Sequence, residues 1–260
     1  MVAPPEDRSQ RLQAESERLE AVYDGYAGSR RKSRAWGLEH PGTAAIRTRL
    51  LELILAAAEQ ELAGRGQVLD IGCGPGWWLE RFRDAGVEEQ RMYGVDAIRE
   101  RIAKGHARLP ESDLRVGDAR SLPYPDRRFS LVLIVSVLSD LGSAEDVETA
   151  LREAERVLGG GGLLLVYEPR MPNPVNLAVR RISKRDFVQV LGREGWSATP
   201  LTVLPPLAYR LGSSTERLYP LLARFRPLLS HRLVEYRKPV QPGSADQPKV
   251  KGGLPIEKRS

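Results

Sequence analysis

The clearest chemical pattern in this chain is a glycine-rich segment. Residues 68–76 read VLDIGCGPG, and a helical pattern opens directly after them at Trp77. Glycines at alternate positions let the backbone turn tightly and approach a ligand without obstruction by a Cβ atom, and the start of a helix offers unpaired N–H groups. The segment therefore predicts a strand, a turn and a helix that together hold a nucleotide-like cofactor.

The spacing of the glycines indicates which cofactor. A dinucleotide-binding turn has the pattern G-x-G-x-x-G and would need glycine at position 77, where this chain has Trp77. Gly72, Gly74 and Gly76 instead follow the pattern G-x-G-x-G behind Asp70, whose carboxylate could accept from an ammonium group or orient a water molecule. We interpret this pattern as favouring S-adenosylmethionine over NAD.

Strand and helix patterns alternate around the glycine-rich segment. Strand patterns cover 67–71, 92–95, 114–116, 131–138 and 163–167, helical patterns cover 43–62, 77–85, 98–109 and 145–158, and two later strand patterns cover 199–204 and 232–237. Residues 131–135 are apolar at every position, as in a central parallel strand covered by helices on both faces. The sequence predicts an α/β fold with a Rossmann-like, doubly wound, mostly parallel seven-stranded sheet, helices on both faces and an N-terminal helical cap.

The expected domain organisation is one domain with appendages. Residues 1–22 are polar and are expected to form a flexible N-terminal arm, 23–238 form the domain with its core at 66–168, and the Pro/Gly/Ser/Lys-rich residues 239–260 form a disordered tail. Gly159–Gly162 are interpreted as a flexible turn, and Ser183 is expected to cap a helix that runs to about Arg193.

Composition limits the class of protein. The chain has 260 residues, of which 41% are hydrophobic, and its formal net charge is +6. Cys73 is the only cysteine, so no intrachain disulfide and no cysteine-based metal cluster can form, and we predict no metal site. No apolar run approaches the ~18–20 residues of a membrane span, and residues 1–8 lack a signal-peptide core. We therefore expect a cytoplasmic protein without an integral membrane span.

With these elements in order, the chain resembles the class I S-adenosylmethionine-dependent methyltransferases, in particular the small-molecule group with an Asp-x-Gly-x-Gly-x-Gly loop. The loop matches Asp70 to Gly76, the acidic residue that ends the second strand matches Asp96, and the third-strand Gly-Asp-Ala matches Gly117-Asp118-Ala119. The resemblance covers roughly residues 66–167. It implies that the glycine loop faces the methionine part of the cofactor, that Asp96 accepts both ribose hydroxyls, and that Asp118 accepts from the adenine amino group.

The resemblance also implies a set of residues that contact the cofactor. They are Asp70, Ile71, Gly72, Cys73, Gly74, Gly76, Trp77, Asp96, Ala97, Gly117, Asp118, Ala119, Ile134, Val135 and Tyr26. Tyr26, with Tyr23, resembles an aromatic pair that covers the cofactor from an N-terminal helix, although a core role fits both equally well. Of Trp77 and Trp78, one is expected to face the pocket and the other the core.

Candidate catalytic residues follow from what methyl transfer needs. The methyl group is already activated, so a protein mainly aligns the acceptor and excludes water. A hydroxyl acceptor also needs a base, for which we name Asp140, Tyr23 and His40, with Glu168 and Tyr26 as further candidates. The family often has histidine where this chain has Asp140. His106 and His231 are interpreted as surface or packing residues.

The acceptor is less constrained than the cofactor. An insert at 205–230 stands where relatives build a substrate lid, and it combines arginines with an apolar helix face of Leu218, Leu221, Leu222, Phe225 and Leu229. We expect a small-molecule, glycan or lipid-linked acceptor that is methylated on oxygen or nitrogen, with peripheral contact of the basic segment 210–238 to the inner face of the membrane. A lid helix that simply packs on the domain is the alternative.

Three other functions stay open. The positive charge would suit nucleic acid, although a lone Cys73 in the glycine loop and the sequence SVLSD after the fourth strand do not match base-methylating enzymes. An RNA methyltransferase is therefore one alternative, and the basic runs are equally explained as solvated faces. A nicotinamide-dependent oxidoreductase and a catalytically silent cofactor-binding protein are the others. The sequence does not indicate the acceptor atom or the oligomeric state.

Overall fold

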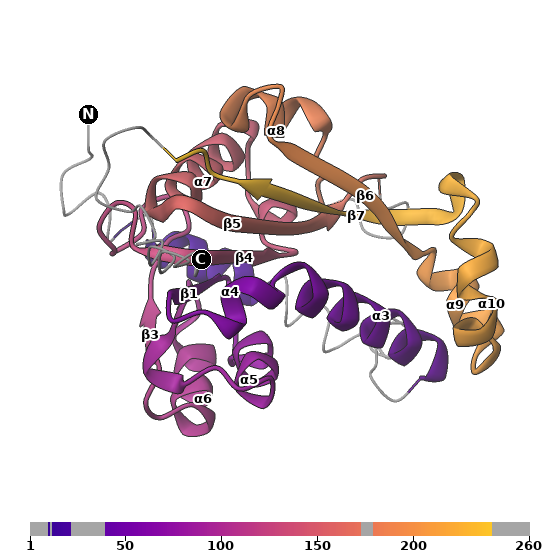
Figure 1. Ribbon diagram of the computed structural model, residues 1–260, viewed down its shortest axis with the longest axis horizontal. Helices are drawn as coiled ribbons and strands as arrows, with labels where there is room; N and C mark the ends of the chain where they lie inside the picture. The colour runs from indigo at the N-terminus through magenta and orange to yellow at the C-terminus, as the bar shows by residue number, and fades with distance from the viewer. Residues whose placement is uncertain (1–9, 11, 22–39, 173–178, 241–260) are drawn as a thin grey trace, which may run out of the picture.

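The computed structural model describes residues 10, 12–21, 40–172 and 179–240 (Figure 1). Tyr23, Tyr26 and the expected tail from 241 onward lie outside these residues, as does most of the expected arm. None of the helices within the described ranges combines the length and the apolar character that a membrane span requires.

Seven strands of the described chain form one sheet. They are β1 (Gln67–Ile71), β2 (Met92–Asp96), β3 (Asp113–Val116), β4 (Phe129–Val135), β5 (Leu158–Pro169), β6 (Trp196–Val203) and β7 (Leu229–Arg237). Their order is β3-β2-β1-β4-β5-β7-β6, and neighbours from β3 to β5 are parallel, whereas β7 is antiparallel to both β5 and β6. The predicted α/β fold with a mostly parallel sheet is confirmed.

Helices cover both faces of the sheet, as predicted (Figure 1). One face carries α3 (Pro41–Ala57), α4 (Glu59–Ala63), α5 (Trp77–Asp84) and α6 (Arg99–Arg108), and the other carries α7 (Ala144–Val157) and α8 (Lys184–Leu191). Successive residues of β4 alternate between the two cores, so that Leu131 and Leu133 pack on the α3 side while Val132 and Ile134 pack on the α7 side. This continuous burial explains why the strand is apolar at every position.

The N-terminal segment contains a helix. Residues 12–21, which were expected to belong to a flexible arm, are helical, and the Arg18 guanidinium donates to the backbone carbonyl of Asp140. Two side chains of this helix, Glu15 and Leu19, line the main pocket. The helix therefore contributes to the site although its sequence is mostly polar.

The glycine run does not form a turn. Gly159–Gly162 lie inside β5, and Gly161 has φ +77°. The Gly161 amide donates to the Lys238 carbonyl at 2.8 Å, and the Lys238 amide donates to Gly162 at 3.0 Å. The expectation of a flexible turn was wrong because the chain just after β7 supplies these glycines with backbone partners. The capped helix after Ser183 is confirmed, but it ends at Leu191, before Gly192.

The insert forms two short helices and a single turn. These are α9 (Pro205–Leu211), α10 (Ser214–Leu222) and η3 (Arg226–Leu228), at the end of the sheet where α3 begins (Figure 1). Helix α9 packs so closely on α3 that a Cβ atom on Gly42 would lie 2.0 Å from the Ala208 carbonyl oxygen. The single apolar helix face expected here was wrong, because the helix ends at Leu222 and leaves Phe225 and Leu229 outside it.

Candidate functional site

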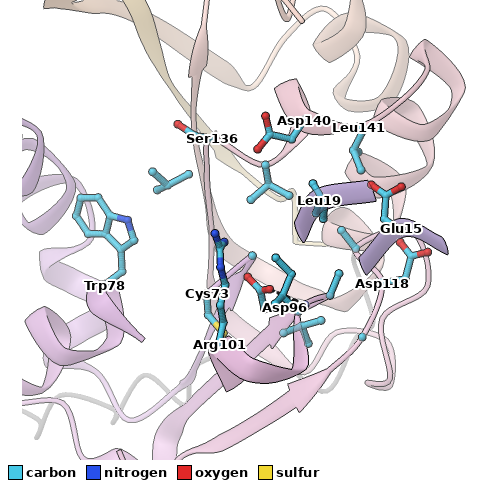
Figure 2. Close-up of a pocket in the computed structure, with 18 of the residues that line it drawn as sticks. Glu15, Leu19, Cys73, Trp78, Asp96, Arg101, Asp118, Ser136, Asp140 and Leu141 are labelled. Atoms are coloured by element: carbon cyan, nitrogen blue, oxygen red, sulfur yellow. Dashed lines mark hydrogen bonds between the residues drawn. The ribbon is translucent and has the colours of Figure 1, made fainter. Parts of the chain in front are cut away.

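The main pocket lies at the carboxyl ends of β1, β2, β3 and β4, with a cavity of about 340 Å³. Parallel sheets commonly bind ligands at this edge, where the loops after the strands converge. Its walls come from the loops after these strands, from α3, α5 and α6, and from the N-terminal helix. Figure 2 shows Asp96 and Cys73 on one side of this space, Asp140 and Ser136 on another, and Glu15 and Leu19 across from them.

The glycine turn has the geometry that its sequence predicts. Gly72, Gly74 and Gly76 have φ of +73°, +53° and +83°, in the left-handed region that glycine adopts without strain. The amides of Gly72 and Cys73 both donate to the Val95 carbonyl, at 2.7 and 3.0 Å, which ties the turn to the end of β2. A Cβ atom on Gly72 would lie 2.2 Å from Val137 Cγ2, so a side chain there would displace the loop after β4.

Asp96 is clamped at the end of β2. Its Oδ2 accepts from the Gly74 amide at 2.9 Å and its Oδ1 accepts from the Ile98 amide at 2.8 Å. Burial raises the pKa of this carboxyl, and the two amides act in the opposite direction. The backbone thus fixes the orientation of a carboxylate that faces the pocket, which is what recognition of a pair of hydroxyls requires.

Asp70 lies beneath the turn and is 1% exposed. One of its oxygens, Oδ2, has no hydrogen-bond partner in the described structure. Burial, followed by the charge of Asp96, raises the pKa of this carboxyl well above its usual range. Two buried carboxyls side by side favour a cation near them, so the residues fit a cofactor that carries ammonium and sulfonium charges.

Asp118 is held by an arginine that the sequence analysis did not single out. The Arg120 guanidinium binds both carboxylate oxygens of Asp118 at 2.8–3.0 Å and also reaches Asp146 at 2.8 Å. These carboxylates raise the pKa of the guanidinium further. Asp118 therefore lines the pocket in a fixed orientation. Helix α7 contributes to this orientation, because its Asp146 also binds Arg120.

Arg47 and Trp77 form another part of the wall. The Arg47 guanidinium lies 4.7 Å from the centre of the Trp77 ring, and the Trp77 and Trp78 rings pack edge to face at 4.6 Å. Burial lowers the pKa of Arg47. Both tryptophans line the pocket, and Trp78 also packs against the core on the α3 side, in keeping with the expectation that one of the two faces the core.

The pocket brings together ten of the predicted site residues. They are Gly72, Cys73, Trp77, Asp96, Ala97, Gly117, Asp118, Ala119, Val135 and Asp140. Asp70, Ile71, Gly74, Gly76 and Ile134 do not line the cavity and support it from behind or below. Their contribution is to shape the turn and the strand ends.

Several wall residues were missed by sequence reasoning. Glu15, Leu19, Arg47, Arg101 and Leu141 come from elements whose contact with the glycine loop depends on tertiary packing. Arg47 and Arg101 stand on helices predicted over 43–62 and 98–109, but the sequence pattern did not place these side chains at the pocket.

The other candidate bases have different environments. His40 caps α3 by accepting from the Gly42 amide at 3.2 Å, and its ring stacks on Tyr209, away from the pocket lining. Glu168 is fully buried and accepts from the amides of Val137, Leu138 and Ser139 at 2.7–3.2 Å. Burial raises its pKa to about 7. Glu168 thus holds the loop that presents Asp140, and among the described candidates only Asp140 lines the pocket.

Comparison with known proteins shows what this chain is similar to. Residues 69–166 match the family model described as "Methyltransferase domain". A probable S-adenosylmethionine-dependent methyltransferase of Mycolicibacterium smegmatis is 28% identical over 56% of this chain and 57% of its own length. A demethylmenaquinone methyltransferase of Renibacterium salmoninarum is 32% identical over 39% of this chain and 40% of its own length.

The similarity to solved structures extends over more of the chain. A SAM-dependent methyltransferase from Archaeoglobus fulgidus superposes with a TM-score of 0.55 and 16% identity, over 73% of this chain and 94% of that one. The curated relatives are matched over about half of their length. Together these findings confirm the predicted methyltransferase fold and S-adenosylmethionine as the cofactor.

Proposed function

The chain carries a class I S-adenosylmethionine-dependent methyltransferase domain, and from that premise we propose that the protein transfers the methyl group of this cofactor to a small-molecule acceptor. The observation that supports this proposal best is the clamped Asp96 carboxylate beside a left-handed glycine turn, both facing one cavity. In this assignment Asp96 binds the ribose, Asp118 the adenine, and the glycine turn the methionine part, with Asp70 balancing its positive charge from below.

Methyl transfer requires mainly that the protein position the acceptor. When bound, the cofactor supplies an activated methyl group, and the protein aligns the acceptor in line with it and excludes water. A hydroxyl or protonated amine acceptor must lose a proton when it receives this methyl group. We assign that proton to Asp140, since its side chain lines the cavity on the loop held by Glu168.

A lipid-linked or prenylated acceptor is the finer proposal. Helix α10 and the residues after it expose large apolar side chains, with Leu221 54% and Phe225 57% exposed, next to exposed Arg217 and Arg224. An apolar surface flanked by cations suits the boundary of an anionic membrane. One matched relative is named for demethylmenaquinone. These features support an acceptor drawn from the inner face of the membrane.

Calorimetric titration with S-adenosylhomocysteine and with NADH, followed by mass spectrometry of acceptor mixtures, tests the central proposal. We expect micromolar binding of the adenosyl compound, weaker or no binding of NADH, and products 14 Da heavier from quinol, glycan-lipid or small hydroxyl acceptors. NADH binding in place of S-adenosylhomocysteine would indicate an oxidoreductase. Cofactor binding without transfer to these acceptors or to RNA would indicate a silent cofactor-binding protein, and transfer to RNA alone would overturn the small-molecule assignment.

Vesicle flotation tests the membrane proposal. The wild type is expected to float with vesicles that contain anionic lipid, and the double variant Leu221→Ser/Phe225→Ser is expected to stay in the dense fraction. Val240→Ser, which removes another exposed apolar side chain far from α10 in the sequence, is the matched control. Equal flotation of the double variant and the wild type would contradict a role for α10.

A further inference from the structure

A second cavity lies at the other end of the sheet and is lined mainly by cationic side chains. Its volume is about 130 Å³, and its walls are Arg170, Lys184, Ala198, Pro200, Arg226 and Arg232. It shares no wall residue with the main pocket. Arg170 directly follows β5, Lys184 begins α8, and the remaining walls come from β6, η3 and β7. Segments that are far apart in the sequence therefore place four cations around one small space.

Arg232 is the unusual member of this set. It stands in the middle of β7, opposite Glu168 of β5 and Pro200 of β6, and it is only 9% exposed. Its Nε and Nη1 are buried and have no hydrogen-bond partner in the described structure. A buried guanidinium whose donors are unpaired is unfavourable relative to one that is paired. No ion pair joins Arg232 to another residue of the described ranges, so the fold keeps a charge here without a counter-ion from that part of the chain.

The neighbours of Arg232 strengthen the positive charge instead of neutralising it. The Arg170 guanidinium is fixed by the backbone carbonyls of Arg226 and Leu229, at 3.0 and 2.5 Å, so it is held in the wall by groups that carry no charge. Burial first, and then the charges of Arg170 and Arg181, lower the pKa of Arg232.

Asp186 is an acid whose charge acts on Arg232, and Glu168, opposite Arg232 in the sheet, is occupied by three backbone amides of the loop after β4. The Asp186 carboxylate accepts from the Ser183 amide at 2.6 Å as part of the capping box of α8, and it does not line the cavity. No carboxylate stands among the described wall residues. The cavity thus has donors on several sides and no built-in acceptor that would neutralise them.

We propose that this cavity binds a phosphate-class oxyanion, with Arg232 at its floor and Arg170, Lys184 and Arg226 around it. The cavity is small and has cations on several sides, which suits a compact tetrahedral anion better than an extended ligand. Guanidinium groups bind phosphate oxygens through paired N–H donors, and Lys184 adds a compact charge at the start of a helix. The oxyanion is either free phosphate or the phosphoryl group of a larger molecule.

Titration calorimetry with inorganic phosphate on the full-length protein tests the proposal at fixed ionic strength, with potassium chloride as the reference salt. The wild type is expected to bind one phosphate, and Arg232→Met to weaken that binding at least tenfold, because the buried donors are removed. Arg65→Met has the same change of charge at an exposed position outside both cavities and is expected to bind phosphate like the wild type. Phosphate binding that matches chloride, or equal affinity of Arg232→Met and the wild type, would overturn the site.

A second variant keeps the test decisive if Arg232→Met does not fold. Lys184 is exposed, so Lys184→Gln is expected to fold and to weaken phosphate binding about threefold or more. Phenyl phosphate distinguishes the two sources of the anion. Tighter binding of phenyl phosphate than of inorganic phosphate would assign the site to the phosphoryl group of a larger molecule, and the reverse order would assign it to free phosphate. Affinity for phosphate that is unchanged by Lys184→Gln would argue against the cavity as the binding site.

Discussion

The two ends of the sheet differ in whether their charged side chains have hydrogen-bond partners. At the main pocket, Asp96 accepts from the Gly74 and Ile98 amides and Asp118 binds the Arg120 guanidinium, although Asp70 Oδ2 beneath the turn has no partner in the described structure. At the β6–β7 end, Arg232 is buried without a partner, and apolar side chains such as Phe225 face solvent. The main pocket, where Asp96 and Asp118 are held in place before any ligand binds, is the organised end of the sheet. The β6–β7 end, where buried donors of Arg232 have no partner in the described chain and Phe225 faces solvent, is the open end.

The largest expected effect is on the organised end. Asp96→Ala should weaken S-adenosylhomocysteine binding about 100-fold, or about 2.7 kcal/mol, since it removes a charged acceptor and frees the Gly74 and Ile98 amides. Calorimetry measures the change. Asp113→Ala removes a carboxylate that pairs with Arg115 outside the pocket, and its affinity should equal that of the wild type. Similar losses in both variants would remove the special role of Asp96.

The second prediction concerns how the free energy of unfolding depends on pH. Burial lowers the pKa of His231 on β7 to about 4, and its ring stacks on Tyr167 at 4.8 Å. The unfolded chain binds this proton near pH 6.5 and the folded chain only near pH 4, so the stabilising contribution is present above pH 6.5 and is lost as the pH falls through 4. The free energy of unfolding should therefore fall steadily as the pH is lowered across this range.

Chemical denaturation at several pH values measures that slope. His231→Phe should flatten it, whereas His106→Phe, at an exposed position on α6, should not. The raised pKa values of Asp70 and Asp96 act in the other direction, because their contribution is present at low pH and is lost as the pH rises through the folded values. An unchanged slope in His231→Phe would show that the β7 end does not respond to acid as its burial predicts.

A smaller effect is expected where the organised end depends on a second residue. Arg120→Gln should weaken S-adenosylhomocysteine binding about tenfold, or about 1.4 kcal/mol, because Asp118 loses the group that orients it. The matched variant Arg115→Gln breaks an exposed ion pair on β3 and should leave the affinity unchanged. Equal affinities of Arg120→Gln and the wild type would show that Asp118 needs no anchor.

The smallest effect is expected at the open end. Phe225→Ser should change the free energy of unfolding by less than about 0.5 kcal/mol, because the side chain is 57% exposed. Phe187→Ala, on the buried face of α8, should cost about 3–5 kcal/mol. Denaturant titration of both variants measures the contrast, and a large loss in Phe225→Ser would mean that the exposed apolar surface is covered in the folded protein.

The sequence predicted the organised end because its signals are local. A strand, a glycine turn and a helix follow one another from Gln67 to Asp84, and each carries its own pattern of apolar residues and glycines. Asp96 and Asp118 could be located because each stands at the end of such a strand. The order β3-β2-β1-β4-β5-β7-β6 and the reversed direction of β7 were not predicted, since both depend on which strands pair across long distances in the sequence.

The open end was predicted less well, because its structure depends on contacts between segments that are far apart in the sequence. The periodicity from Leu218 to Leu229 suggested one helix, but α10 ends at Leu222 and a separate turn, η3, begins at Arg226. Helix 12–21 reached the pocket without an apolar pattern, through Leu19 and the bond from Arg18 to Asp140. Arg232 gave no signal at all, because a single arginine in a strand pattern is ordinarily an exposed residue.

The position of β7 between β5 and β6 has a consequence for biosynthesis. Of the seven strands, β7 is synthesised last, and it pairs with β5 on one side and β6 on the other. Strands β5 and β6 therefore do not pair with each other, and neither has its β7 partner until β7 is made. Until then the apolar residues 163–167 of β5 form an unprotected edge, and such edges recruit other chains. The entry of β7 between β5 and β6 is therefore the step that removes this edge from the nascent chain.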